Sequence, residues 1–266
     1  MSKVIKKQFK NNLRETVLET VNELGGFKKF ISPGDIVLLK PNFNTADPFP
    51  ASTDFEFLKI MVELVYEAGA KEVIVGDSCT IYQKTKNVLK DKGIYELEKL
   101  AKPARVINFD EDKWIKKKIP NGKFLESVRV PAILDKVDKL IYLPCLKTHY
   151  IAKFTASLKL SVGFMKTIER VGLHARHVEE KIAELNKVIN PDLIIMDARK
   201  IFITKGPTDG EVREPNLILA STNRVAIDIE GVKIIKSFKG NTLAEVEPED
   251  LEQIKVAKEI GIDKGK

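Results

Sequence analysis

Short, largely apolar runs alternate with segments of helical periodicity along most of this chain. The runs lie at residues 36–39, 72–75, 139–143, 193–196 and 217–220. Apolar residues recur at helical spacing at residues 12–23, 55–67, 178–189, 225–232 and 248–260. A strand without a polar face must be covered on both sides, which is typical of a parallel sheet. The alternation therefore predicts an α/β fold with a mostly parallel sheet and helices on both faces.

A hairpin is expected beside this sheet, because Asn121-Gly122 is a strong turn signal between residues 115–119 and 124–130. No linker rich in proline or serine and no internal repeat divides the chain, so we expect a single α/β domain over residues 1–266. A short helix is expected at residues 95–101. The residues expected to cap the helices at 55–67 and 225–232 are Ser52 or Thr53, and Ser221 or Thr222.

The formal charge of +7 leaves three interpretations of the surface open. Lysines are interleaved with glutamates, and the longest basic run is residues 116–118. This distribution favours a solvated surface with many ion pairs, typical of heat-adapted proteins. An anion-attracting face is the second interpretation. A nucleic-acid surface is the third, and the lack of aromatic residues in the basic segments counts against it.

Cysteine content and hydropathy narrow the classes of protein further. No run approaches the roughly 20 apolar residues that a membrane span needs, and the first residues have no apolar core of a secretory signal. We therefore expect a cytoplasmic location. Cys79 and Cys145 are too few for a disulfide framework, a zinc knuckle or a cysteine-ligated iron–sulfur cluster. Inert core positions are the favoured interpretation of both, and thiols facing each other across a cleft are the alternative.

Polar side chains follow the first four apolar runs, at the point where each strand is expected to end. They are Lys40 and Asn42, then Asp77 and Ser78, then Lys147, Thr148 and His149, and finally Asp197. Open α/β sheets bind ligands at the carboxyl ends of their strands. A charged residue at a single strand end often only meets water, but four such endings together predict a binding site.

All three histidines, His149, His174 and His177, occur in one short stretch that is also rich in lysine and arginine. Histidine acts as an acid, a base or a metal ligand near neutral pH, and a shielded lysine such as Lys159 becomes a base or nucleophile. The cationic surroundings suit a carboxylate or a phosphate. A purely structural role for each histidine remains the alternative.

A metal site is a further hypothesis. The spacing of His174 and His177 would place two imidazoles on one helical turn, with Glu179 or Glu180 as the nearby acidic residue. A divalent metal such as nickel is the candidate ion. The turn-rich residues 206–210 either form a lid over the cleft or are an ordinary turn.

Several motifs in order resemble the family called domain of unknown function 362. They lie at residues 25–42, 67–78, 146–163, 197–210 and 220–228. Some members of that family carry a ferredoxin-like iron–sulfur region. These 266 residues have too few cysteines for one, so the resemblance implies that any redox partner is a separate iron–sulfur protein.

A more distant resemblance is to the nickel-pincer lactate racemase family. His149, Lys159 and His174 stand at nearly the spacing at which those racemases carry a catalytic histidine, the lysine that holds the cofactor and a nickel-ligating histidine. The racemases have an additional histidine after the second strand, where this chain has Asp77-Ser78-Cys79. The resemblance therefore implies a shared scaffold and cleft more than a shared reaction.

The preferred hypothesis is an enzyme that acts on a small anionic molecule, a carboxylate or phosphate, by His/Lys acid–base chemistry. The residues assigned to catalysis are His149, Lys159 and Lys147, and those assigned to substrate binding are Lys40, Asn42, Asp77, Ser78, Thr148 and Asp197. His149 is the expected general acid/base, and Lys159 is an anion binder or cofactor attachment point. The alternative is a non-catalytic metal- or cofactor-binding protein that works with a separate redox partner.

Overall fold

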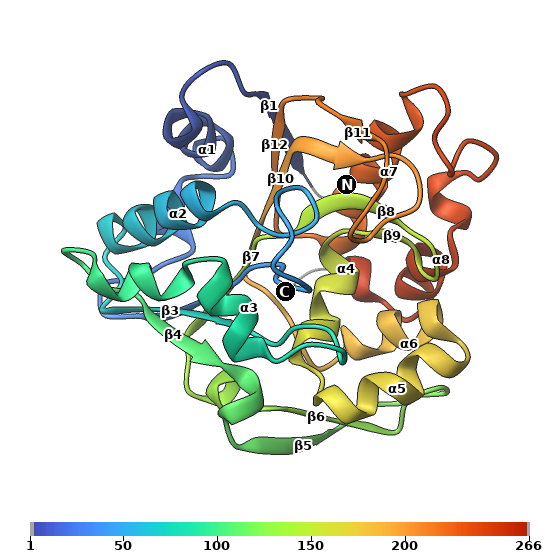
Figure 1. Ribbon diagram of the computed structural model, residues 1–266, viewed down its shortest axis with the longest axis horizontal. Coiled ribbons are helices and arrows are strands. Elements are labelled where there is room, and N and C mark those ends of the chain that lie inside the picture. The colour runs from blue at the N-terminus through green and yellow to red at the C-terminus, as the bar shows by residue number, and fades with distance from the viewer. Residues whose placement is uncertain (1–2, 265–266) are drawn as a thin grey trace.

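A ten-stranded mixed sheet forms the centre of the computed structural model, which describes residues 3–264 (Figure 1). Its strands are β1 (Val4–Gln8), β2 (Ile36–Lys40), β3 (Glu72–Asp77), β4 (Arg105–Asn108), β7 (Lys139–Tyr142), β8 (Cys145–His149), β9 (Lys153–Thr155), β10 (Leu193–Phe202), β11 (Val212–Arg213) and β12 (Leu217–Ser221). The main path runs β1-β12-β10-β7-β2-β3-β4. The pairs from β10 to β4 are parallel, whereas β12 and β1 are antiparallel to their neighbours. The predicted α/β fold with a mostly parallel sheet is confirmed.

Helices cover both faces of this sheet. They are α1 (Leu13–Asn22), α2 (Phe55–Glu67), α3 (Thr85–Asp91), α4 (Ser157–Leu160), α5 (Thr167–Ala175), α6 (Val178–Leu185), α7 (Arg224–Lys236) and α8 (Glu252–Glu259). Single 3₁₀ turns occur at Phe27–Lys29, Ile94–Lys99, Phe109–Glu111, Ala132–Asp135, Ser161–Phe164, Pro248–Asp250 and Ile262–Lys264. Within residues 3–264, no helix is long and apolar enough to cross a membrane.

Successive side chains of the central strands belong to two separate cores, as the period of a strand requires. In β2, Val37 and Leu39 pack in the core that contains α1 and α2. Leu38 between them packs in the core of α6, α7 and α8. All three side chains are fully buried, which explains why the runs read as continuously apolar.

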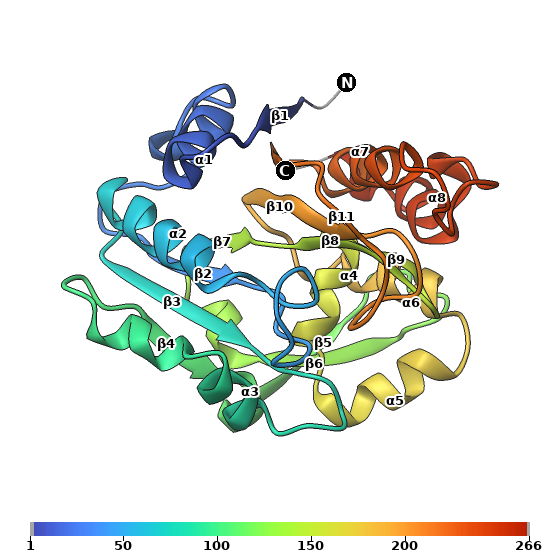
Figure 2. The same ribbon diagram turned by 45° about the horizontal axis from the view of Figure 1, so that its top comes forward.

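The hairpin at Asn121-Gly122 is confirmed as antiparallel, with β5 (Trp114–Lys118) paired to β6 (Ser127–Pro131). It forms a separate two-stranded sheet, and Figures 1 and 2 place it on the side of the main sheet away from α1 and α2. Val128 and Val130 are buried in the second core. The hairpin therefore covers the sheet face near β3 and β4.

Several expected boundaries are wrong in detail. Asp54 and Asn223, one residue further on than expected, cap α2 and α7 through their side chains. The helix expected at residues 95–101 is the 3₁₀ turn Ile94–Lys99. The strand expected at residues 193–196 continues to Phe202, because its second half pairs with β8 and β11. That extension changes the surroundings of Asp197, as described below.

Candidate active site

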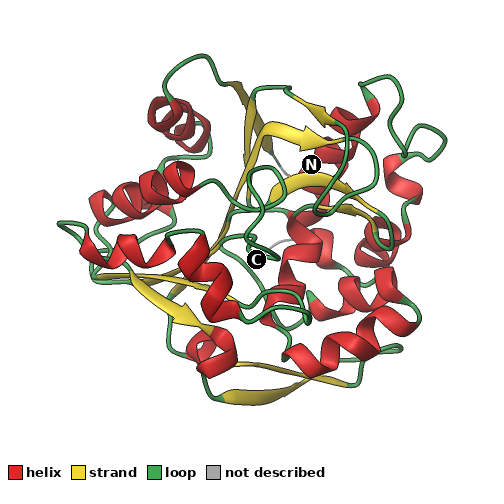
Figure 3. Cartoon of the chain, viewed as in Figure 1, coloured by secondary structure: helices red, strands yellow, loops and turns green. Residues whose placement is uncertain are grey.

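A cavity of about 450 Å³ opens where β2, β3 and β8 end. The long segment between β2 and α2, residues 41–54, contains no helix or strand and borders it (Figure 3). The predicted site residues in its wall are Lys40, Asn42, Asp77, Ser78, Lys147, His149, Lys159 and His174. Residues far apart in sequence thus meet at the carboxyl ends of the strands, as the topology requires.

Asp197 and Thr148 lie outside the wall of this cavity. Asp197 is inside β10 rather than at its end, and its carboxylate accepts a 2.7 Å bond from Nη2 of Arg199. Arg199 also bridges to Asp54 at 2.6 Å, so the carboxylate belongs to a buried ion-pair network. The hydroxyl of Thr148 donates to the carbonyl of Phe202 at 3.4 Å. Thr148 thus links β8 to β10, and Asp197 balances the charge of Arg199 on its own strand.

His177 also lies outside the cavity wall, and it does not share a helical turn with His174. Helix α5 ends at Ala175, the backbone is extended at Arg176, and His177 adopts φ 55° as the N-cap of α6. Its ring packs against Phe124 in a tilted arrangement, with centroids 4.6 Å apart. The change of backbone direction separates the two imidazoles that were expected to act together.

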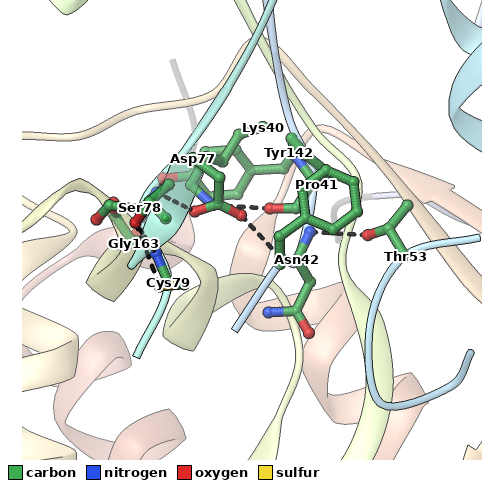
Figure 4. Close-up of polar contacts among 12 residues, drawn as sticks. Lys40, Pro41, Asn42, Thr53, Asp77, Ser78, Cys79, Tyr142 and Gly163 are labelled. Atoms are coloured by element: carbon green, nitrogen blue, oxygen red, sulfur yellow. Dashed lines mark hydrogen bonds and ion pairs between the residues drawn. The ribbon is translucent and has the colours of Figure 1, made fainter. Parts of the chain in front are cut away.

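Lys40 and Asp77 form a buried ion pair at the carboxyl ends of β2 and β3 (Figure 4). The Nζ–Oδ1 distance is 2.6 Å, and Nζ also donates to the carbonyl of Pro41 at 2.7 Å. Oδ2 of Asp77 accepts from the amide of Phe43 at 2.8 Å. Burial lowers the pKa of Lys40 and raises that of Asp77, and the charge of each partner opposes the shift of the other. The pair ties the two strand ends together.

Arg170 of α5 is buried against the segment that follows β3. Its guanidinium donates to the carbonyls of Ser78, Cys79, Gly163 and Met165, and also to the hydroxyl of Ser78. Ser78 is therefore fixed in the cavity wall by an arginine that has no carboxylate partner in direct contact among residues 3–264. Arg170 adds positive charge to the cavity.

Lys147 is a second buried cation without a carboxylate partner in the described part of the chain. Its Nζ donates to Oδ1 of Asn42 at 2.8 Å and to the carbonyls of Pro50 and Ala51. Burial lowers the pKa of Lys147 to about 8. Neutral oxygens stabilise an ammonium less than a carboxylate does, so this lysine retains unbalanced positive charge.

Lys159 faces the cavity from α4, and within residues 3–264 its amine has no hydrogen-bond or ion-pair partner. Burial, followed by repulsion from Lys147 and Arg170, lowers the pKa of Lys159 to about 7. Its short helix is held by the buried carboxylate of Asp228, which accepts from the amides of Ser157 and Leu158 at 2.8 and 2.9 Å. Lys159 is thus positioned firmly while its amine stays available.

Replacing Lys159 by Met is expected to raise the free energy of unfolding at pH 6 by about 2 kcal/mol, because it removes a partly buried charge that has no carboxylate partner among residues 3–264. The gain shrinks as pH rises from 7 toward 10, where the native lysine is already neutral and the unfolded one is still protonated. Denaturant titrations at several pH values measure this. Lys86→Met, at an exposed position of α3, is the matched control. An equal gain in both variants would contradict the assignment.

Two backbone amides fix the tautomer of His149, so that its Nε2 is the hydrogen-bond donor. Its Nδ1 accepts from the amides of Ile151 and Ala152 at 3.1 and 3.2 Å. Since an amide can only donate, Nδ1 carries the lone pair and the neutral ring has its proton on Nε2. Burial, with Lys159 and Lys147 nearby, lowers the pKa of His149 and keeps the ring neutral.

His174 is held in the opposite tautomer. Its Nδ1 lies 2.7 Å from the carbonyl of Arg170, which can only accept, so the proton is on Nδ1. Burial lowers the pKa of His174, so the neutral ring presents an unprotonated Nε2. Nε2 of His174 has the lone pair that a general base or a metal ligand needs. One cavity wall therefore carries a neutral donor and a neutral acceptor.

Both cysteines are buried thiols. Sγ of Cys145 lies 3.8 Å from the hydroxyl of Thr53, and burial raises the pKa of Cys145 to about 11. Burial also raises the pKa of Cys79, which contacts the hydroxyl of Thr85. Raised thiol pKa values agree with the favoured interpretation of inert positions.

Sequence reasoning missed several residues of the wall. Thr155 is one: its hydroxyl is buried and lacks a partner among the residues that the structure describes. Gly163 is another, because a Cβ there would lie 2.6 Å from Nζ of Lys40. Tyr82 and Tyr150 also line the cavity. The position of Gly163 inside a recognised motif is the one signal that could have identified any of them.

The family model described as domain of unknown function (DUF362) matches residues 37–233. A thylakoid-associated protein of Synechocystis sp. is 29% identical over 213 residues, which cover 77% of this chain and 64% of the relative. The chain thus spans less than two thirds of the length of that protein. A solved structure, the lactate racemase apoprotein from Thermoanaerobacterium thermosaccharolyticum, aligns with 12% identity and a TM-score of 0.47 over 86% of this chain and 56% of that one.

The family match extends from β2 into α7 and includes every strand end that contributes to the cavity. It confirms the resemblance that the sequence motifs indicated. Because it covers well over half of the chain, the chain belongs to the family described as domain of unknown function (DUF362).

Proposed function

We propose that this chain is an enzyme that moves a proton on a small molecule carrying a carboxylate, phosphate or similar anionic group. The observation that carries the proposal is the pair of opposite tautomers at His149 and His174 beside the amine of Lys159, which has no partner in the described part of the chain. A neutral base and a neutral donor in one cavity are the two groups that proton abstraction and oxyanion stabilisation need.

The positively charged side chains of the cavity wall are the reason for proposing an anionic substrate. Among the described residues, the cavity is lined by four cationic side chains, Lys40, Lys147, Lys159 and Arg170, and by one carboxylate, that of Asp77. Lys40 is neutralised by Asp77, whereas Lys147 and Arg170 bond to neutral oxygens. The amine of Lys159 has no partner among the described residues and can therefore donate hydrogen bonds to a bound anion. Its positive charge is favoured once an anion is present.

The two histidines take different roles in this proposal. Nε2 of His174 accepts a proton from the substrate. The Nε2–H group of His149 donates a hydrogen bond to the substrate oxygen on which negative charge develops. The sequence hypothesis assigned acid–base catalysis to His149. The amides that bond Nδ1 of His149 favour a donor role, because protonating Nδ1 would break both bonds.

Sulfate binding is expected to be accompanied by proton uptake of roughly half a proton at pH 7.5, since the anion raises the pKa of Lys159 from about 7. Affinity should fall about 10- to 100-fold between pH 6 and pH 9 as the amine loses its proton. Calorimetry in two buffers of different ionisation enthalpy measures both quantities. Lys159→Gln should bind weakly without this pH dependence, and Lys86→Gln should match the parent protein. A sulfate affinity that changes neither with pH nor in Lys159→Gln would contradict the proposal.

A cofactor-binding protein is the second candidate function. The observation in its favour is the near-neutral amine of Lys159 with the unprotonated Nε2 of His174 in the same cavity. Within residues 3–264, no three His, Cys, Asp or Glu side chains gather to hold a metal ion. His174 offers one imidazole nitrogen, so a metal held here, nickel for example, would take its other ligands from an organic group bound with it.

In this second proposal, Lys159 would hold the organic group covalently, and a separate iron–sulfur protein would exchange electrons with it. The bound group would supply the redox or hydride chemistry. Intact mass and elemental analysis of protein from its native source test the idea. Added mass on Lys159 with stoichiometric metal supports it, and an unmodified, metal-free chain that exchanges protons on substrate contradicts it.

A further inference from the structure

The mouth of the cavity is apolar and exposed. Of the six large apolar side chains exposed within residues 3–264, Tyr82, Tyr150 and Val171 line the cavity, and Ile168 lies one helical turn from Val171 on α5. Tyr82 is 87% exposed and Tyr150 is 73% exposed. We call Tyr82, Tyr150 and Val171 the apolar lip. They come from three separate segments, so the tertiary fold gathers them at this place.

An exposed apolar cluster at a cavity entrance is typical of a surface that a ligand covers. The cavity has a volume of about 450 Å³, within the range of sites for ligands of drug size and larger than a three-carbon acid fills. The charged side chains and the apolar lip of the cavity differ in their exposure to solvent. Lys147 is 1% exposed, whereas the lip residues are mostly exposed. A polar, cationic inner end thus continues into an apolar outer end.

We propose that the ligand of this cavity is amphiphilic, with an anionic head at Lys159 and an aromatic or branched apolar body against the apolar lip. The inference rests on the proposed function, because it uses the same anion site. Tyr150 stacks on the ring of His149 with centroids 5.3 Å apart and planes 8° apart. His149 lies in the same cavity wall as Lys159 and is affected by its charge, so head and body sites are adjacent and one ligand of moderate size can contact both.

A small molecule is favoured over a protein partner because the lip residues line the cavity itself rather than a separate flat face. Pro207 of the turn-rich loop 204–210 closes the wall further. The apolar body would be enclosed between segments that follow β3 and β8 and helix α5.

Methyl sulfate and phenyl sulfate test the inference, because they carry the same charged head and differ in the apolar body. Calorimetry is expected to show phenyl sulfate binding about 10- to 100-fold more tightly, from the apolar area that the lip covers. The double variant Tyr82→Ser/Val171→Ser should lose most of this preference while its affinity for methyl sulfate stays unchanged. Val212→Ser, at an exposed valine outside the cavity wall, is the matched control and should keep the preference.

The outcomes separate the two proposals. If neither sulfate binds, the anion site itself is refuted. Equal affinity for both sulfates overturns the amphiphilic ligand while the anion site stands. A phenyl preference that survives in Tyr82→Ser/Val171→Ser also overturns the role of the lip.

Discussion

His174→Gln is expected to lower the rate of proton exchange on substrate by about 10²- to 10⁴-fold, the usual contribution of a positioned general base. The reason is the tautomer of His174. Its Nδ1 proton is bound to the carbonyl of Arg170, so Nε2 holds the lone pair that faces no protein partner among the described residues. A glutamine amide cannot accept a proton at neutral pH. The measurement is incorporation of deuterium from D₂O next to the carboxylate, followed by NMR over a panel of carboxylic acids.

The pH profile gives an independent check on the same base. The pKa of His174 is lowered, so exchange should stay constant as pH falls through 6.5, the ordinary histidine value. The rate should fall above pH 7 as Lys159 loses its charge and the anion binds less well. A rate that halves near pH 6.5 would contradict the assignment.

Two further variants complete this experiment. His149→Gln keeps an N–H donor near the position of Nε2 and is expected to retain more activity than His149→Leu, which removes the donor and should cost about 10²- to 10³-fold. His177→Gln is the matched control, because that ring lies outside the cavity wall and packs against Phe124. Full activity in His174→Gln with none in His149→Gln would reverse the two roles.

Gly163→Ala is expected to destabilise the protein by about 3 kcal/mol and to lower Tm by about 6–12 °C. The added Cβ would lie 2.6 Å from Nζ of Lys40 and 2.8 Å from Oδ1 of Asp77. Neither group can move away cheaply, since Lys40 also bonds the carbonyl of Pro41 and Asp77 also bonds the amide of Phe43. The methyl group therefore separates or strains a fully buried ion pair, which is far more damaging than the loss of an exposed one.

Gly172→Ala on α5 is the matched control for this prediction. A Cβ at Gly172 meets no other atom within 4 Å, so alanine should raise stability by about 0.5–1 kcal/mol through its higher helix propensity. Thermal and denaturant unfolding of both variants measure the difference. If Gly163→Ala is as stable as the parent protein, the Lys40–Asp77 pair is not rigid enough to act as the tie between β2 and β3.

The sequence determined the sheet and most of the polar side chains that line the cavity at the strand ends. Runs such as residues 36–39 are apolar throughout because both faces of β2 are buried, so the period of the pattern encodes the layered fold. Parallel strands deliver their carboxyl ends to one edge by topology alone. Lys40, Asp77, Lys147 and His149 could therefore be assigned to one place before any contact was known.

Tertiary structure alone decided what each of these groups can do. Asp197 sits inside β10 because pairing with β8 extends the strand, and no local pattern in residues 193–202 encodes that pairing. His174 and His177 lie on different elements, because α5 ends at Ala175 and an extended residue, Arg176, precedes the N-cap of α6. The tautomers of the cavity histidines depend on amides and carbonyls that only the folded backbone brings within hydrogen-bonding distance.

The same limit applies to charge and to the apolar lip. Lys159 is one lysine among many in the sequence, and its low pKa arises from burial beside Lys147 and Arg170, which lie on other elements. Tyr82, Tyr150 and Val171 are unremarkable in sequence and meet only in space. Periodicity and strand-end position are local properties that a sequence carries directly. Desolvation, repulsion between charges and the meeting of distant side chains are set by three-dimensional distance, and therefore by the fold.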